Sequence, residues 1–87
     1  MQYYSGKRIW IIGASDGIGA ALAKRLSDMG AMLALSARNA QALYDLQAKL
    51  AGSRHLVLPL DVTNQATLNQ AWKTLTEAWV LPDIILY

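Results

Sequence analysis

The chain has 87 residues, 54% of them hydrophobic and 16% charged, which is enough for one domain with one core and excludes a second domain. Its eight basic and six acidic residues give a net charge of +2 and are dispersed, so the clustered basic face that nucleic-acid backbones require is missing. The absence of cysteine and the single histidine exclude a disulfide framework, a thiolate nucleophile and a structural zinc site.

The first eight residues carry no recognisable targeting signal. Lys7 and Arg8 precede an apolar stretch that is much too short for a signal peptide or a membrane span. We therefore expect a soluble cytoplasmic protein that binds neither membranes nor nucleic acid.

Residues 8–12 predict a strand with apolar side chains on both faces, as is typical of a central strand in a parallel sheet covered on both sides. The next seven residues, Gly13-Ala14-Ser15-Asp16-Gly17-Ile18-Gly19, place three glycines between this strand and a helical pattern. In such a turn the first glycine allows the tight turn, the second lets backbone N–H groups approach phosphate oxygens, and the third lets helix pack on strand. The segment, called the glycine turn below, predicts a site for the diphosphate of a dinucleotide, favoured by the helix dipole.

Three other residues of the glycine turn are candidates for the same site. The Ser15 hydroxyl could donate to a phosphate, and the Ile18 N–H should point along the helix axis toward it. Asp16 suits a helix N-terminus but not a neighbouring phosphate, so we expect its side chain to face solvent or a ribose.

Two helices and a strand are predicted next. Residues 17–29 form an amphipathic pattern that stops at Gly30, and residues 32–36 form a second strand. Asn39 can cap a second helix, which Gly52 closes. The residues expected to face the core are Ile18, Leu22, Leu26 and Met29 in the first helix and Leu43, Leu46 and Leu50 in the second.

The last third of the chain repeats this alternation. Residues 55–58 predict a third strand, Thr63 or Asn64 caps a third helix that ends before Pro82, and residues 83–87 predict a fourth strand. The apolar face expected on the third helix consists of Leu68, Ala71, Trp72, Leu75, Ala78 and Trp79.

The pattern βαβαβαβ predicts an α/β fold with a parallel four-stranded sheet of order 3-2-1-4, because such crossovers are right-handed. The first two helices then share one face of the sheet and the third lies on the other. The fourth strand becomes an apolar edge, which favours a homo-oligomer formed through that edge or the uncovered sheet face.

Four segments together resemble the short-chain dehydrogenase/reductase family over essentially the whole chain. They are the Gly-x-x-x-Gly-x-Gly spacing of Gly13, Gly17 and Gly19, and the stretches Leu-Ser-Ala-Arg-Asn at 35–39, Leu-Asp-Val at 60–62 and Pro-Asp-Ile-Ile-Leu at 82–86. The family's turn usually begins with threonine, where this sequence has Ile12. The resemblance implies a Rossmann-like fold, with residues 1–87 as the N-terminal dinucleotide-binding portion of a single domain.

The resemblance also implies a cofactor preference. In the family an acidic residue after the second strand favours NAD and a following arginine favours NADP; here Ala37 holds the acidic position and Arg38 the basic one. A guanidinium can bind a 2′-phosphate through paired charge-assisted hydrogen bonds, whereas a carboxylate would repel it. NADP(H) is therefore expected over NAD(H), and Asn39 either adds a hydrogen bond to that phosphate or only caps its helix.

By the same resemblance Asp61 would accept a hydrogen bond from the adenine amino group, with the Val62 backbone beside it. The residues alone also allow Asp61 to be a turn aspartate. His55 is expected to be structural, and neither Tyr44 nor Tyr87 is given a catalytic role.

The family's Asn-Ala-Gly turn, catalytic serine and Tyr-x-x-x-Lys pair have no counterpart in these 87 residues. We therefore expect the cofactor-binding part of an oxidoreductase that transfers hydride between nicotinamide and a carbonyl or alcohol, without turnover of its own and without a metal. Two other hypotheses remain. One is a non-catalytic nucleotide-binding or interaction module; the other is an S-adenosylmethionine site, which the lack of an acidic residue at Ala37 and Arg38 disfavours.

Overall fold

The structure, a computed structural model, describes residues 4–87. Residues 1–3 of the predicted dinucleotide-binding portion lie outside the described residues. Strands and helices alternate throughout. The elements are β1 (Arg8–Ile12), α1 (Gly17–Asp28), β2 (Met32–Ser36), α2 (Ala40–Gln47), β3 (Leu56–Val57), α3 (Gln65–Trp79) and β4 (Ile84–Leu86).

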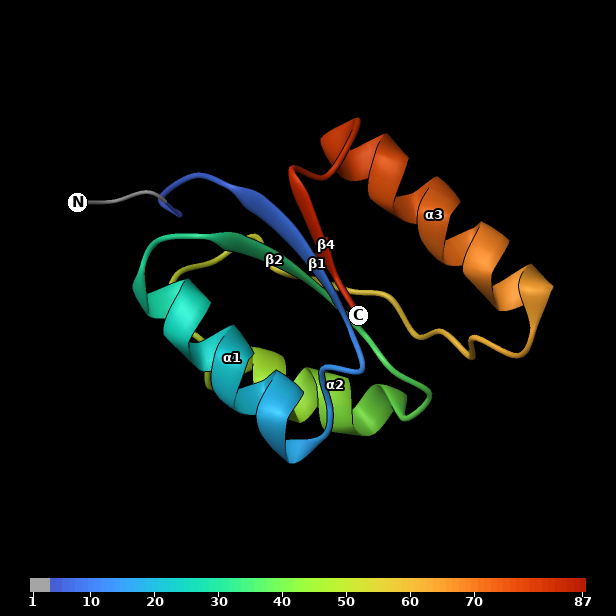
Figure 1. Ribbon diagram of the computed structural model, residues 1–87, viewed down its shortest axis with the longest axis horizontal. Helices are drawn as coiled ribbons and strands as arrows, with labels where there is room; N and C mark the ends of the chain where they lie inside the picture. The colour runs from blue at the N-terminus through green and yellow to red at the C-terminus, as the bar shows by residue number, and fades with distance from the viewer. Residues whose placement is uncertain (1–3) are drawn as a thin grey trace.

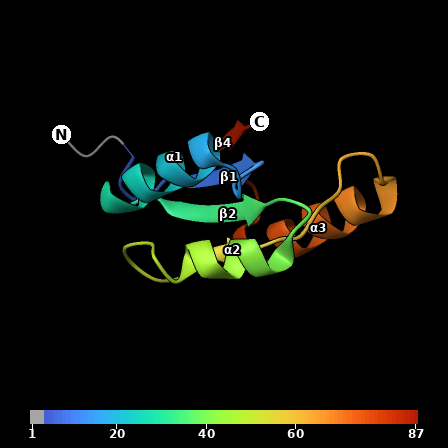
Figure 2. The same cartoon turned by 90° about the horizontal axis from the view of Figure 1, so that it is seen from below.

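The strands form one parallel sheet in the order β3-β2-β1-β4, which confirms the predicted topology. Helices α1 and α2 cover one face and α3 covers the other, giving three layers (Figure 1). In the view from below, α1 and α2 lie side by side on the near face of the sheet and α3 lies on the far face (Figure 2). Because β1 pairs with β2 on one side and β4 on the other, the strand before the glycine turn is central.

Each face of the sheet carries its own hydrophobic core. Alternate residues of β1 contribute to both cores: Ile9 and Ile11 pack toward α1 and α2, and Trp10 packs toward α3. The first core is completed by residues such as Leu33, Leu35, Ala23, Leu26, Leu43 and Leu46, and the second by Ala34, Leu58, Leu60, Ala71, Leu75 and Trp79. The apolar character of the predicted central strand is thus explained by helices on both sides.

The predicted core face of α1 is wrong in part. Leu26 is buried as predicted, but Ile18 is 86% exposed, Leu22 37% and Met29 38%, and the other buried residues of the helix are Ala23 and Ser27. The reason is the close approach of α1 to the glycine turn, since a Cβ on Gly19 would overlap the carbonyl oxygen of Gly13. Near the glycine turn the helix therefore leaves Ile18 and Leu22 outside, and only further along does a large residue, Leu26, enter the core.

Several boundaries also differ from the predicted ones. α1 ends one residue earlier, α2 ends at Gln47 well before Gly52, and β4 is shorter at both ends. β3 contains only Leu56–Val57, yet the Leu58 and Leu60 amides still donate to the carbonyls of Leu35 and Ala37 at 2.9 Å each. Pairing with β2 thus continues beyond the strand and skips Pro59, which has no amide hydrogen.

The α3 face is less complete than predicted. Trp72 is 41% exposed and stacks on Trp10 with ring centroids 6.0 Å apart, and Ala78 is exposed. The helix caps agree better with expectation. Asn39 Oδ1 accepts from the Ala42 amide at 3.1 Å and Asn64 Oδ1 from the Ala66 amide at 3.0 Å, so Asn64 and not Thr63 caps α3.

Polar side chains fasten the amino end of the sheet. The His55 ring is buried, accepts from the Leu33 amide at 3.1 Å through Nδ1 and lies 2.7 Å from the Ala51 carbonyl oxygen through Nε2, which must therefore carry the hydrogen. On the other side of the sheet the Arg8 amide donates to Asp83 Oδ2 at 2.8 Å, and the Arg8 guanidinium donates to the Trp79 carbonyl. These contacts agree with a structural role for His55.

In residues 4–87 no helix is both long and apolar enough to cross a membrane.

Candidate functional site

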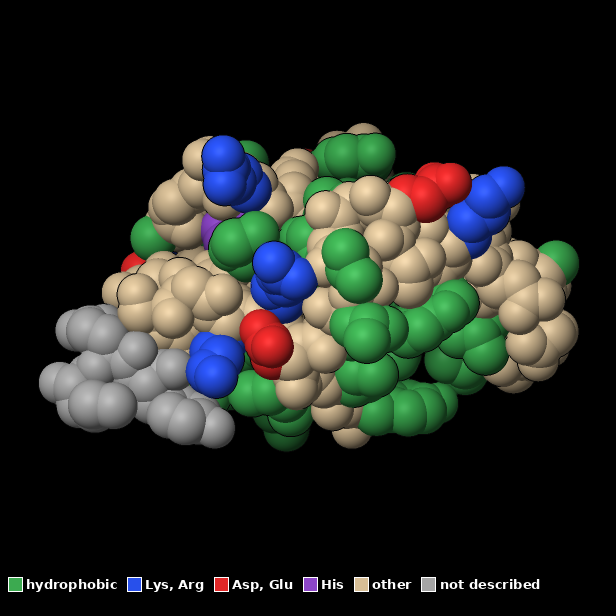
Figure 3. Space-filling view, turned by 90° about the horizontal axis from the view of Figure 1, so that it is seen from above, with side chains coloured by type: hydrophobic (Ala, Val, Ile, Leu, Met, Phe, Trp, Pro, Cys, Tyr) green, Lys and Arg blue, Asp and Glu red, His purple; other side chains and the backbone are tan. Residues whose placement is uncertain are grey.

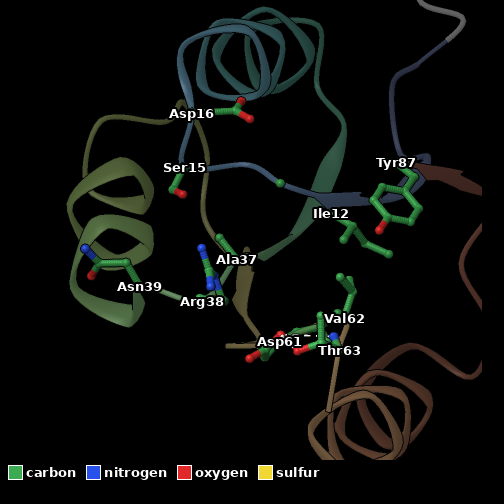
Figure 4. Close-up of a pocket in the computed structure, with 12 residues that line it drawn as sticks. Ile12, Ser15, Asp16, Ala37, Arg38, Asn39, Asp61, Val62, Thr63 and Tyr87 are labelled. Atoms are coloured by element: carbon green, nitrogen blue, oxygen red, sulfur yellow. Dashed lines mark hydrogen bonds between the residues drawn. The ribbon is translucent and has the colours of Figure 1, made fainter. Parts of the chain in front are cut away.

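A large cavity opens at the carboxyl end of the sheet, beside the ends of β1 and β2 and the segment that follows β3 (Figure 4). Its volume is about 580 Å³. In an open α/β sheet this end, beside the strand where the winding direction reverses, is where ligands bind. The lining residues are Ile12, Gly13, Ser15, Asp16, Ala37, Arg38, Asn39, Leu60, Asp61, Val62, Thr63 and Tyr87.

The glycine turn is anchored to the end of β2. The amides of Gly13 and Ala14 both donate to the Ser36 carbonyl oxygen, at 2.7 and 3.1 Å. Gly13 has φ +92°, a conformation that other residues rarely adopt. The Ser36 hydroxyl accepts from the indole N–H of Trp10, which belongs to the core on the α3 side, at 2.8 Å. Ser36 is therefore bonded both to the glycine turn and to a residue of that core.

At the start of α1 one amide is capped and two are left available. Asp16 is the N-cap residue, and its Oδ1 accepts from the Gly19 amide at 3.0 Å. The amides of Gly17 and Ile18 make no hydrogen bond to any residue of 4–87. A Cβ on Gly17 would meet no atom within 4 Å, so the space above this backbone is open to a ligand. Free helix N-terminal amides beside open space suit a phosphate.

The residues after β2 supply the positive charge of the cavity. Arg38 is exposed, and its side chain makes no hydrogen bond to any of the residues described. Figure 4 shows its guanidinium between the glycine turn and Asp61. Asn39 uses Oδ1 to cap α2, which leaves its Nδ2 group able to donate. Capping and ligand binding by Asn39 are therefore compatible.

Asp61 is held in a fixed position by a local turn. Its Oδ1 accepts from the Thr63 hydroxyl at 2.7 Å and from the Thr63 amide at 3.0 Å. These two bonds, and more weakly the charge of Arg38, hold the pKa of the Asp61 carboxyl below its ordinary value of 3.8. The side chain is therefore ionised at neutral pH, with Oδ2 accepting no hydrogen bond from residues 4–87.

A second groove of about 280 Å³ adjoins the first. It shares Ile12, Asp16 and Tyr87 with the large cavity, and the rest of its lining is mostly apolar: Ile11, Ile18, Gly19, Leu22 and Leu86. The exposed side chain of Ile18, which was predicted to face the core, thus lines this groove.

The ten residues predicted for the site fall into three groups. Seven line the large cavity: Gly13, Ser15, Asp16, Arg38, Asn39, Asp61 and Val62. Ile18 and Gly19 line the second groove, and Gly17 lines neither, although it borders open space. The Asp16 side chain is exposed as expected, and its capping role was not foreseen.

The sequence interpretation missed Thr63 and Tyr87 as parts of the site. Thr63 positions Asp61, and the Asp-x-Thr spacing, which is typical of a side-chain turn, could have indicated this. Tyr87 was considered only as a catalytic residue, and nothing in its local sequence places it at the cavity. In the described part of the chain, no three His, Cys, Asp or Glu side chains lie close enough to hold a metal ion.

Known proteins share this arrangement. The family described as short chain dehydrogenase matches residues 7–86. Mouse "Dehydrogenase/reductase SDR family member 7" is 37% identical over 84 residues, covering 90% of this chain and 25% of the mouse protein. The Arabidopsis thaliana "NADPH-dependent pterin aldehyde reductase" is 34% identical over 83 residues, covering 94% of this chain and 34% of the plant protein.

Among solved structures, L-sorbose reductase from Gluconobacter frateurii, complexed with NADPH and L-sorbose, is 30% identical with a TM-score of 0.87. The match covers 93% of this chain and 32% of the reductase. The chain thus spans only about a quarter to a third of the length of these relatives. Because the family match includes nearly every residue and the sheet order and glycine turn agree with it, the chain belongs to the short-chain dehydrogenase/reductase family.

Proposed function

We propose that residues 1–87 are the N-terminal dinucleotide-binding portion of an oxidoreductase and that they bind NADP(H) in preference to NAD(H). When bound, this cofactor supplies hydride exchange between its nicotinamide and a carbonyl or alcohol carbon. The observation that carries the proposal is the pair Ala37 and Arg38 at the cavity wall, where no carboxylate occupies the residue directly after β2 and a guanidinium has no hydrogen-bonded partner among residues 4–87.

The rest of the cavity fits the cofactor. The Gly17 and Ile18 amides and the exposed Ser15 hydroxyl would hold the diphosphate, since each is a donor without an acceptor in the described structure. Arg38 and the Asn39 amide group would hold a 2′-phosphate. Asp61, with Oδ2 available and Oδ1 fixed by Thr63, would accept from the adenine amino group beside the Val62 backbone.

Two similar proteins support the choice of NADP(H). The plant relative is named for its dependence on NADPH, and the sorbose reductase was solved with NADPH. The shared fold positions the residues after the second strand at the cavity. The guanidinium of Arg38 is therefore the group of this chain best placed to select NADP(H) over NAD(H).

The test is calorimetric titration with NADPH and NADH before and after Arg38→Ala. The substitution should remove most of the preference for NADPH, a loss of about 1.5 to 3 kcal/mol for a hydrogen bond to a charged group. The matched control is Arg25→Ala, which removes an exposed arginine from α1 away from the cavity and should leave both affinities unchanged. An unaltered preference in Arg38→Ala would retire the assignment.

The proposal assigns binding, and no catalytic residue, to these 87 residues. Diphosphate, ribose and adenine contacts come from the glycine turn, Arg38 and Asp61, and none of these groups is a proton donor poised for carbonyl chemistry. We expect bound cofactor without reductase turnover by the 87-residue chain. The cytoplasm remains our proposed location, in keeping with a chain that has no cysteine.

We also propose that the chain self-associates through β4, with a second copy as the occupant of that edge. β4 pairs with β1 on one side only, and hydrophobic side chains gather along this side of the molecule in the space-filling view (Figure 3). Val80 is 72% exposed, Leu81 58% and Ile85 52%. An open ladder edge flanked by apolar side chains can pair with the same edge of another molecule.

Sedimentation at high micromolar concentration tests this proposal. The unsubstituted chain should sediment as an oligomer and Ile85→Lys as a monomer, because a charge on the edge blocks strand pairing. Tyr44→Lys is the matched control, since Tyr44 has nearly the same exposure, 53%, on α2 instead of the sheet edge. A monomeric unsubstituted chain would refute self-association.

A further inference from the structure

Asp16 is a carboxylate at the start of α1, where the proposed ligand would carry its negative charge. Asp16 lines both the large cavity and the second groove, together with Ile12 and Tyr87, so it lies where the two adjoin and is the charged residue common to both linings. Figure 4 shows it next to Ser15, at the point of the glycine turn where α1 begins. Its Oδ1 accepts from the Gly19 amide at 3.0 Å, which fixes the carboxylate at the first turn of α1.

The charge at this place is not needed for capping. Asparagine and serine cap helices about as well as aspartate, because each offers an oxygen to the same backbone amides. The structure itself uses asparagine for this purpose at both other helices, through Asn39 and Asn64. The negative charge of Asp16 therefore matters chiefly for the affinity of a ligand that binds beside it.

That effect is repulsive and local. The free amides of Gly17 and Ile18, which would hold the diphosphate, belong to the same helical turn as the Asp16 carboxylate. The other charged groups that line the cavity, Arg38 and Asp61, belong to the segments after β2 and β3, on the far side of the glycine turn. No basic side chain lines either cavity at the α1 end, so the Asp16 charge is offset there by the helix amides but by no cation.

We infer that Asp16 is a specificity-determining residue that selects diphosphate diesters, as in dinucleotides, against nucleotides that end in a terminal phosphate. The inference rests on the proposed function. A terminal diphosphate carries one more negative charge than the same diphosphate esterified at both ends, so the carboxylate penalises it more. In water each added unit of ligand charge should cost roughly three- to fivefold in affinity at short range.

Calorimetry with ADP-ribose and ADP tests the inference, because the two probes share adenosine and diphosphate and differ at the terminal phosphate. Asp16→Asn keeps the cap and removes the charge. Both probes should bind more tightly to this variant, ADP should gain roughly three- to fivefold more than ADP-ribose, and added salt should shrink the difference. NADPH should also gain affinity, and the melting temperature should be nearly unchanged.

Asp28→Asn is the matched control, since it removes the same charge from the last residue of α1, at the end remote from the cavity. It should leave both affinities as they are. Asp16→Ser serves as a second capping variant should Asp16→Asn fold poorly. Equal gains for ADP and ADP-ribose, or none, would overturn the inference while NADPH binding by the unsubstituted chain upholds the proposed function; no binding of NADPH by that chain would overturn both.

Discussion

The two ends of the sheet contain similar polar side chains that are used in opposite ways. At the amino end His55 bonds to the backbone at Leu33 and Ala51, and Arg8 bonds to the segment that leads into β4. At the carboxyl end Arg38 and Ser15 make no side-chain hydrogen bond to residues 4–87, although both line the large cavity. Groups of the first kind hold the fold together, and groups of the second kind are available to a ligand.

This contrast predicts that substitutions at the amino end change stability alone, and that most substitutions at the carboxyl end change binding alone. A substitution at Gly19, at the carboxyl end, should be the largest exception, because it should change stability. A Cβ there would overlap the Gly13 carbonyl, which belongs to the backbone and cannot rotate away as a side chain would. Gly19→Ala should lower the free energy of unfolding by about 3 kcal/mol, measured by urea denaturation.

Gly17→Ala is the matched control for this prediction. Its Cβ would enter open space, so stability should change little, whereas affinity for NADPH should fall because the methyl group occupies the approach to the free amides. If Gly17→Ala lowered the free energy of unfolding as much as Gly19→Ala, that result would contradict the open space that surrounds a Cβ at position 17.

His55→Ala should produce the next largest effect, at the opposite end of the sheet. The substitution leaves the buried Leu33 amide without an acceptor, which should cost about 2 kcal/mol of unfolding free energy. Affinity for NADPH, measured by calorimetry on the folded fraction, should stay the same because His55 lines neither cavity. A large loss of affinity would contradict the separation of the two ends.

Thr63→Val should have the smallest effect and confine it to the cavity. Removing the hydroxyl removes the first cause of the lowered Asp61 pKa, so the pKa should rise toward 3.8. A lowered pKa stabilises the folded chain above the unfolded-state value and loses that contribution as the pH falls through the folded value. The difference in stability between the two proteins should therefore be present at pH values above about 4 and disappear as the pH falls through the folded-state pKa.

An NMR titration of the Asp61 carboxyl carbon measures this shift directly. The wild-type titration midpoint should lie below that of Thr63→Val. Identical midpoints would show that the Thr63 hydroxyl does not hold the carboxylate in solution.

The topology and most of the cavity could be predicted from the sequence because both depend on local signals. The order 3-2-1-4 follows from alternating strands and helices, and the cavity follows from the ends of those strands. The buried face of α1 could not be predicted in the same way. Apolar spacing favoured Ile18 and Leu22, but how close α1 approaches β1 depends on Gly19 meeting Gly13 across the turn, which is a tertiary contact.

Two features of the site were beyond the sequence for the same reason. That Asp16 rather than solvent would satisfy the Gly19 amide depends on the conformation of the turn, and that Tyr87 lines the cavity depends on the orientation of its side chain after β4, which the predicted strand order does not give. Local patterns can identify which residues end a strand. They do not show which side chains near those ends turn into the cavity.

The two hydrogen bonds that join the glycine turn to Ser36 have a practical consequence. Its carbonyl holds the Gly13 and Ala14 amides, and the chain continues directly into Ala37 and Arg38. Every one of these anchoring atoms belongs to the main chain, so the side chains at 37 and 38 can be exchanged without loosening the turn. Under the proposed function, exchanging these two side chains should therefore change which nicotinamide coenzyme binds, while the backbone that would hold its diphosphate stays intact.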